Sequence, residues 1–173
     1  PKERREAMHL AVAEWLEPHV RTGGTQFDGV IGHHFLTAGE GVRALAYLKR
    51  AAKHELALYD LDAAIATFRA CLSTLTLVPG AEMTARRRSE LSLAFRAELV
   101  RLQVLTGALQ QAIEDTDDVA GGAEVQGRAA RHSQAQVFMG RGWALMRLGR
   151  YPAAREAFTF VGTSLDGSGE VPT

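Results

Sequence analysis

The stretch Leu-Met-Arg-Leu-Gly-Arg-Tyr-Pro-Ala-Ala-Arg-Glu-Ala-Phe-Thr-Phe-Val, residues 145–161, decides the fold of this chain. Gly149 predicts a tight turn, because glycine readily takes the left-handed conformation that ends helices. Pro152 fits the first turn of a second helix, where a missing amide is tolerated. The stretch therefore predicts two helices that pack against each other. Such a unit cannot bury its apolar faces alone, so it also predicts stacked neighbours.

The positions on either side of this turn match one repeat pattern. The small residue at which the two helices touch falls on Gly142. The apolar anchors are Phe138 and Leu145 in the first helix and Tyr151, Ala154, Phe158 and Val161 in the second. This pattern resembles a tetratricopeptide repeat (TPR), although Arg141 replaces the usual leucine and no closing proline stands near Asp166. The resemblance implies an all-α, TPR-like right-handed α-solenoid of antiparallel helix pairs.

The same frame recurs through most of the chain, with Gly39, Tyr59 and Gly107 at the turn position of earlier units. Gly107 and Gly149 lie farther apart than the roughly 34-residue tetratricopeptide period, so the first helices should be longer than usual. Residues 86–106 indeed form one uninterrupted helical pattern. We expect a single TPR-like domain over residues 1–173, with about eight helices. Its approximate repeats are 25–58, 45–78, 93–126 and 135–168, after an entry helix at 1–24.

The composition agrees with a helical chain and excludes several classes of protein. Of 173 residues, 46% are hydrophobic, enough for one sizeable core. Twenty basic and twenty acidic residues cancel, so the net charge provides no global electrostatic attraction to nucleic acid or to an anionic membrane. The apolar runs are too short to span a bilayer, and no secretory signal opens the chain. Because the single cysteine, Cys71, offers no disulfide framework, we expect a cytoplasmic protein.

The two ends predict a fragment of a larger multidomain protein, since the chain starts at Pro1 without a methionine and ends in a glycine-containing tail. Residues 1–17 resemble the helix that follows the winged-helix part of bacterial STAND-type signal-transduction ATPases. Residues 31–51 resemble the first repeat helices of the same class. In such proteins a nucleotide-binding module precedes a helical-repeat sensor, and a nucleotide cyclase, kinase or transcription effector lies elsewhere in the chain. The resemblance over residues 1–76 implies a TPR-like sensor region of such a protein.

The sequence shows no set of residues that would catalyse a reaction, so we expect no enzyme, cofactor or metal site within these residues. A nucleotide-binding loop ending in Gly-Lys-Ser or Gly-Lys-Thr is missing, and Gly121-Gly122 is better explained as a helix stop. His54-Glu55 begins like a zinc-protease helix, but Leu58 stands where the second histidine is required. Any ATPase, cyclase or kinase activity would belong to other domains of the full-length protein.

Three further groups of reactive side chains are explained more simply by structure. His33 and His34 are adjacent, so they point to different helix faces, one toward the groove and the other toward the neighbouring helix. The acidic run over residues 114–118 is expected on a solvated helix face rather than around a calcium ion. Cys71 takes a small-residue packing position, which predicts a buried structural thiol.

The repeat frame also predicts which side chains line the concave surface, because the first helix of each pair lines that groove. Met139, Trp143 and Met146, at spacings of four and three, form an apolar stripe that either binds a partner or packs under a neighbouring segment. Lys49 and Lys53 lie one turn apart on the same face. The predicted partner-binding residues are His33, Lys49, Lys53, Arg101, Gln136, Met139, Trp143, Met146 and Arg147.

A groove with cationic flanks and an apolar end suits an acidic or carboxylate-terminated peptide. We therefore expect an interaction or sensor domain that binds a protein or peptide segment, which includes another domain of the same protein. Two alternatives remain open. One is a small-molecule effector sensor that controls an attached ATPase, cyclase, kinase or transcription effector, and the other is an architectural spacer. Peptide binding should depend on the basic residues and on salt, whereas small-molecule binding should depend on Met139 and Trp143.

Overall fold

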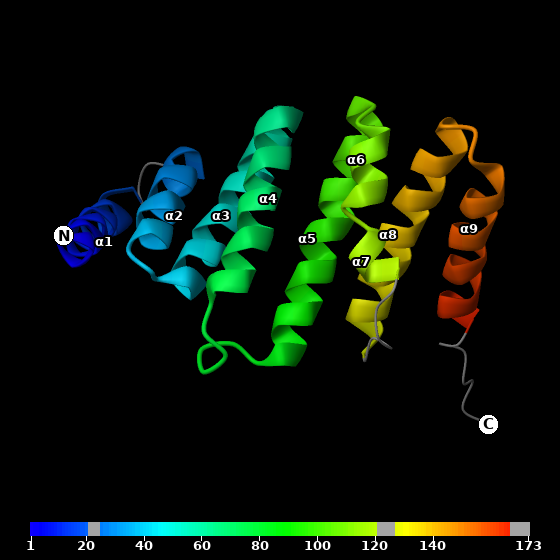
Figure 1. The fold of residues 1–173 in the computed structure, drawn as a ribbon. Coiled ribbons are helices and arrows are strands. Elements are labelled where there is room, and N and C mark those ends of the chain that lie inside the picture. The colour runs from blue at the N-terminus through cyan, green and yellow to red at the C-terminus, as the bar shows by residue number, and fades with distance from the viewer. Residues whose placement is uncertain (21–24, 121–126, 167–173) are drawn as a thin grey trace, which may run out of the picture. The chain divides into compact units, whose positions relative to one another are not determined.

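The computed structural model describes residues 1–20, 25–120 and 127–166, and these residues form helices without any strand (Figure 1). The predicted all-α class is therefore confirmed for this part of the chain. The contacts divide the chain into two compact units, Pro1–Arg88 and Ser89–Thr173. None of the described helices combines the length and the apolar character needed to cross a membrane. The Gly121-Gly122 pair and the tail over residues 167–173 lie outside the described residues.

The first unit is a succession of helices in which each packs against the next along the chain (Figure 1). A short 3-10 helix, η1, precedes α2. The core of this unit contains Phe35 and Tyr47, with Ala13 buried from α1. The elements are α1 (Lys2–Val20), η1 (Thr25–Phe27), α2 (Asp28–Thr37), α3 (Gly41–Ala57) and α4 (Leu61–Leu77).

The second unit contains most of the long helix that the sequence predicts, which runs from Ala85 to Thr106 as α5. Two short helices follow α5, and α8 then packs against both α6 and α9. Val100, Phe138, Leu145 and Val161 are among the buried residues of the core. The elements after α5 are α6 (Leu109–Glu114), α7 (Asp117–Ala120), α8 (Arg128–Arg147) and α9 (Tyr151–Asp166).

The same left-handed turn recurs after α2, α3, α5 and α8, at the four positions that the repeat frame predicts. The φ angles of Gly39, Tyr59, Gly107 and Gly149 are 85°, 59°, 84° and 74°. After α8, the Arg150 N–H donates to the Leu145 carbonyl and the Gly149 N–H to the Met146 carbonyl, and the same two bonds close α2 and α3. This is the Schellman pattern, in which a left-handed residue satisfies the last carbonyls of a helix.

Close helix contacts also fall where the frame predicts small residues. A Cβ built on Gly142 would lie 2.5 Å from Phe158 Cε1, and one built on Gly32 would lie 3.0 Å from Leu48 Cγ. Of the predicted second-helix anchors, Ala154 and Val161 are buried, whereas Tyr151 is exposed. The repeating helix–turn–helix pattern is therefore present in the described residues.

Candidate functional site

A groove of about 420 Å³ lies between α5 and α8 of the second unit. Its lining is mostly apolar and includes Leu105 of α5, Met139 and Trp143 of α8, and Val161 of α9. Polar side chains also reach it, namely Glu98 and Arg101 from α5 and His132 and Gln136 from α8. This combination of an apolar surface with a few polar groups is typical of ligand pockets.

Gly140 sets how closely α5 and α8 approach each other. A Cβ built on Gly140 would lie 2.4 Å from Cγ1 of Val100, whose side chain is fully buried. Farther along both helices, Arg147 Nη1 donates to the Val104 carbonyl at 2.6 Å. The later residue of α8, Arg147, meets the later residue of α5, Val104. The two helices therefore run parallel, as the ribbon also shows (Figure 1).

Since the two helices run parallel, residues that precede the Val100–Gly140 contact on either helix lie at the same end of the groove. The side chains differ in polarity between the two ends. Glu98 and Gln136 precede the Val100–Gly140 contact along their helices, while Leu105 and Trp143 follow it. Arg101 extends toward the polar end, where its Nη2 and Nε lie 2.7 Å and 3.0 Å from Oε2 of Glu98. The polar end thus holds one cation and one anion that are paired with each other.

Large apolar side chains at the apolar end, and Met139 beside Gly140 in the middle of the groove, are accessible to solvent. Leu105 is 63% exposed, Trp143 47% and Met139 40%. The Trp143 ring meets Phe158 edge to face, with 5.9 Å between the ring centroids, and this contact positions the indole. Large apolar side chains that gather around one groove mark a surface on which a ligand would remove much apolar area from water.

Of the nine predicted partner-binding residues, Arg101, Gln136, Met139 and Trp143 line this groove. Met146 instead lines a separate hollow with Tyr151 and Phe158, and Arg147 donates its hydrogen bond to the α5 backbone. The stripe therefore divides between two surfaces, with Met139 and Trp143 in the α5–α8 groove and Met146 in a hollow formed with α9. His33, Lys49 and Lys53 belong to the first unit, on α2 and α3.

Sequence reasoning missed Glu98, Leu105 and His132 as lining residues. Leu105 lies one helical turn after Arg101, and His132 lies one turn before Gln136. Residues four apart share a helix face, so extending the predicted positions by one turn would have found Leu105 and His132.

No family model, curated protein or solved structure matches this chain. The groove, its register and its charges are therefore the observations from which a function can be inferred.

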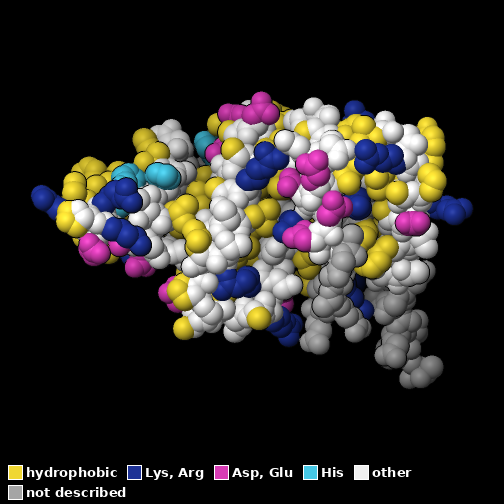
Figure 2. Space-filling model, viewed as in Figure 1, with side chains coloured by type: hydrophobic (Ala, Val, Ile, Leu, Met, Phe, Trp, Pro, Cys, Tyr) yellow, Lys and Arg dark blue, Asp and Glu magenta, His cyan; other side chains and the backbone are white. Residues whose placement is uncertain are grey.

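Histidine side chains lie over α1 and α2 of the first unit (Figure 2), and His54 lies farther along, on α3. His9 Nδ1 and His34 Nδ1 lie 2.9 Å apart, so one nitrogen donates a hydrogen bond to the other. Burial, followed by the charges of His9 and His33, lowers the pKa of His34. His34 thus faces the neighbouring helix, as predicted for one of the two adjacent histidines. Within the described ranges, no three or more His, Cys, Asp or Glu side chains are placed to hold a metal ion.

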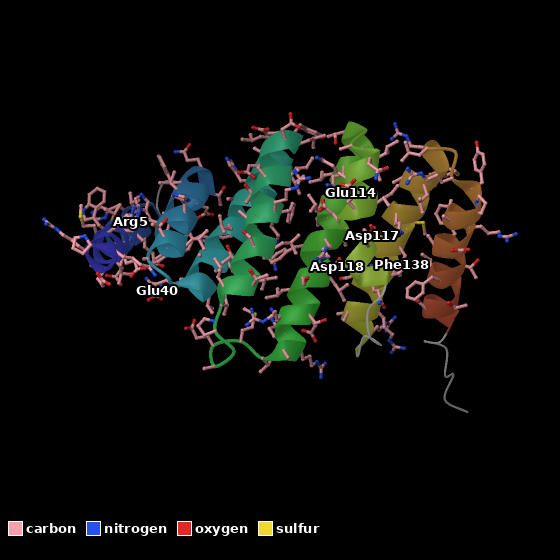
Figure 3. The ribbon with its side chains drawn as sticks, in the orientation of Figure 1. Arg5, Glu40, Glu114, Asp117, Asp118 and Phe138 are labelled. Carbon is pink, nitrogen blue, oxygen red and sulfur yellow. The ribbon has the colours of Figure 1, made fainter. Side chains whose placement is uncertain are left out.

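The acidic run lies on two short helices, with Glu114 on α6 and Asp117 and Asp118 on α7 (Figure 3). The Asp117 carboxylate pairs with Arg141 and the Asp118 carboxylate with Arg96. Glu114 accepts a hydrogen bond from Gln110. The Asp117 and Asp118 carboxylates therefore connect α7 to α8 and α5, whereas the Glu114 bond stays within α6.

Cys71 is fully buried in α4, as its packing position predicts. Burial, and to a lesser extent the charge of Glu55, raises the pKa of Cys71 to about 12. The side chain therefore stays in the thiol form at neutral pH, which is the less nucleophilic form.

Proposed function

We propose that this chain is a sensor module of a larger signalling protein and that it holds a small molecule in the α5–α8 groove. The observation that carries the proposal is the groove itself, with its volume of about 420 Å³ and its accessible Met139 and Trp143. Small-molecule sites are commonly clefts of roughly 300–1,000 Å³ with an apolar lining and a few polar groups.

The proposed architecture is a TPR-like right-handed solenoid, in which the first helices of stacked helix pairs line the surface that binds ligands. The recurrent left-handed turns after α2, α3, α5 and α8 support it. The resemblance of residues 1–76 to STAND-type ATPases supports attachment to an ATPase, cyclase, kinase or transcription effector, and with it a cytoplasmic site of action. In this proposal the module does not catalyse a reaction and passes the state of the groove to a separate effector domain.

A second candidate is binding of a peptide or protein segment, the function that the basic residues of the sequence first suggested. Trp143 and Met139 favour it, because tryptophan is enriched at binding hot spots and methionine at adaptable binding surfaces. Lys49 and Lys53 would have to contribute from the first unit. A purely architectural role would require neither set of residues.

The test compares small molecules retained from a cell extract by the wild-type chain, by Trp143→Ala and by Trp15→Ala. Trp15 is the matched control, since it is the other tryptophan of the chain, is 62% exposed and lies on α1. We expect mass spectrometry to detect a compound that Trp15→Ala retains and Trp143→Ala loses. If the chain instead retained a protein that dissociates at high salt, the result would favour peptide or protein binding. If Trp143→Ala retained every compound that the wild-type chain retains, the groove would not be the binding site.

A further inference from the structure

We infer that the α5–α8 groove selects an uncharged amphipathic molecule, with its apolar body against Met139 and Trp143 and a hydrogen-bonding group at the Arg101–Glu98 end. The inference rests on the proposed function, because it names the chemical class of the ligand held by the same groove.

The first step concerns size. The groove measures about 420 Å³, and its width is set where the Gly140 backbone packs against the fully buried side chain of Val100. Well-packed contacts of this kind resist deformation, so the groove does not close without disturbing the core. A compact molecule fills such a space, whereas most of a peptide helix about 10 Å in diameter would stay outside it.

The second step concerns the apolar end. Leu105, Met139 and Trp143 together expose large apolar surfaces around one hollow. Removing such surface from water is favourable. Because Trp143 is held against Phe158, its ring is already positioned before a ligand arrives. A ligand with a flat or branched apolar body would therefore bind without first ordering this side chain.

The third step concerns charge. Arg101 and Glu98 are both about half exposed, with side-chain exposures of 52% and 45%, and they form an ion pair at 2.7 Å. An anionic ligand bound to Arg101 would be repelled by the neighbouring Glu98, and a cationic ligand bound to Glu98 would be repelled by the neighbouring Arg101. An uncharged group can instead bond to other N–H groups of Arg101, to the Gln136 amide or to His132 without separating the pair. The polar end therefore offers hydrogen bonds but little net charge.

The test uses two dyes with the same aromatic body. N-phenyl-1-naphthylamine is uncharged, and 8-anilino-1-naphthalenesulfonate carries a sulfonate on the equivalent framework. Emission of each dye is titrated against the wild-type chain at low and high salt. We expect the uncharged dye to bind about tenfold more tightly than the sulfonate, with an affinity that salt does not reduce. Tighter, salt-sensitive binding of the sulfonate would overturn the inference and favour an anionic ligand.

A matched pair of leucines locates the bound dye. Leu105→Glu places a charge in the groove, whereas Leu77→Glu changes a similarly exposed leucine at the end of α4, where Leu77 is 70% exposed. We expect Leu105→Glu to weaken the uncharged dye by about tenfold or more, and Leu77→Glu to leave its affinity unchanged. In the Trp15→Phe variant, energy transfer from Trp143 to the bound dye provides an independent measure of position. Equal weakening by both leucine variants, or no transfer, would contradict binding in the groove.

Glu98→Gln tests the charge argument directly, because it removes the partner of Arg101. We expect this variant to tighten the sulfonate dye severalfold, since an unpaired guanidinium attracts anions, so that the difference in affinity between the two dyes becomes smaller. An unchanged sulfonate affinity would overturn the role of the ion pair. The proposed function is contradicted by a different result, namely that Trp143→Ala loses no compound that the wild-type chain retains. Trp143-dependent retention of an anion or an acidic peptide would instead overturn only the inference about charge.

Discussion

Tyr59 occupies a left-handed turn position that glycine fills in the three equivalent turns. Its φ is 59°, and its side chain is 86% exposed, so the ring contributes little packing. A left-handed conformation costs a residue with a Cβ roughly 1–2 kcal/mol. We predict that Tyr59→Gly raises the free energy of unfolding by about 1 kcal/mol. Urea denaturation followed by circular dichroism measures it.

The control for this substitution is Tyr151→Gly, because Tyr151 is also exposed but begins α9 with ordinary helical geometry. Glycine at this helical position is expected to lower stability. If both variants destabilised the chain, relief of the left-handed conformation would not explain the behaviour of Tyr59.

The His9–His34 contact makes the first unit sensitive to acid. The pKa of His34 is lowered from 6.5 in the folded protein, so the unfolded chain binds the proton more strongly. The contribution of neutral His34 to the free energy of unfolding is therefore fully present above pH 6.5. It is lost as the pH falls from 6.5 toward the lowered pKa of His34 in the folded state. Protonating both rings also removes the acceptor of the Nδ1–Nδ1 hydrogen bond.

We predict that the urea concentration at the unfolding midpoint of the wild-type chain decreases as the pH is lowered from about 7.5 to about 5.5. His34→Gln should reduce this dependence of the midpoint on pH. His132→Gln, at an exposed histidine of the second unit, should keep this dependence. A dependence that is equal in all three proteins would assign the acid sensitivity to other groups.

At the level of elements, Gly140 is predicted to hold α5 and α8 together. Gly140→Ala would push its new Cβ to within 2.4 Å of Val100 Cγ1, and overpacking a buried contact typically costs about 1–3 kcal/mol. Alanine recovers part of this through its higher helix propensity. We predict a net loss of about 1 kcal/mol, measured by denaturation with Trp143 fluorescence in a Trp15→Phe background.

Gly162 of α9 provides the control, because a Cβ built there meets nothing within 4 Å. Gly162→Ala should therefore stabilise the helix by about 0.5–1 kcal/mol. Equal effects of the two substitutions would show that helix propensity, and not the α5–α8 contact, governs Gly140.

The sequence allowed the local features of these elements to be predicted. Gly149 and Gly107 indicated turns because few residues adopt positive φ, and Gly142 indicated a close helix contact because it carries no side chain. The sequence predicted an apolar end and cationic flanks, but it did not predict which side chains of α5 and α8 face each other across the groove. This pairing depends on the register between α5 and α8, which the contact of Gly140 with Val100 sets across many residues of intervening chain. Periodicity assigns a residue to a helix face and says nothing about its height relative to another helix.

The fate of Met146 illustrates the same limit. Its spacing from Trp143 places both on one side of α8, but α9 folds back beside the last turns of α8 and takes up Met146. Only the direction of the following helix decides which stripe residues stay in the groove. The ion pair of Arg101 with Glu98 was visible as a spacing of three, yet its consequence for ligand charge required the groove around it.

At the level of the whole molecule, the division into two units predicts that packing defects stay local. In stacked helical repeats each element contacts mainly its neighbours, so stability is approximately a sum of local terms. Gly140→Ala perturbs the second unit, while Gly32→Ala would press a new Cβ against Leu48 in the first, at 3.0 Å from its Cγ. Amide hydrogen exchange measured by mass spectrometry separates these effects along the sequence.

We predict that Gly140→Ala speeds exchange in α8 and α9 and leaves the α3 amides protected, and that Gly32→Ala shows the reverse pattern. A ligand in the α5–α8 groove should counteract the first substitution and not the second, because binding stabilises the state that contains the intact site. The proposed sensor function would require such a localised response, since the state of one groove could then alter nearby helices without unfolding the rest. Uniform loss of protection in both variants would instead indicate one cooperative unit, in which ligand binding stabilises the whole chain at once.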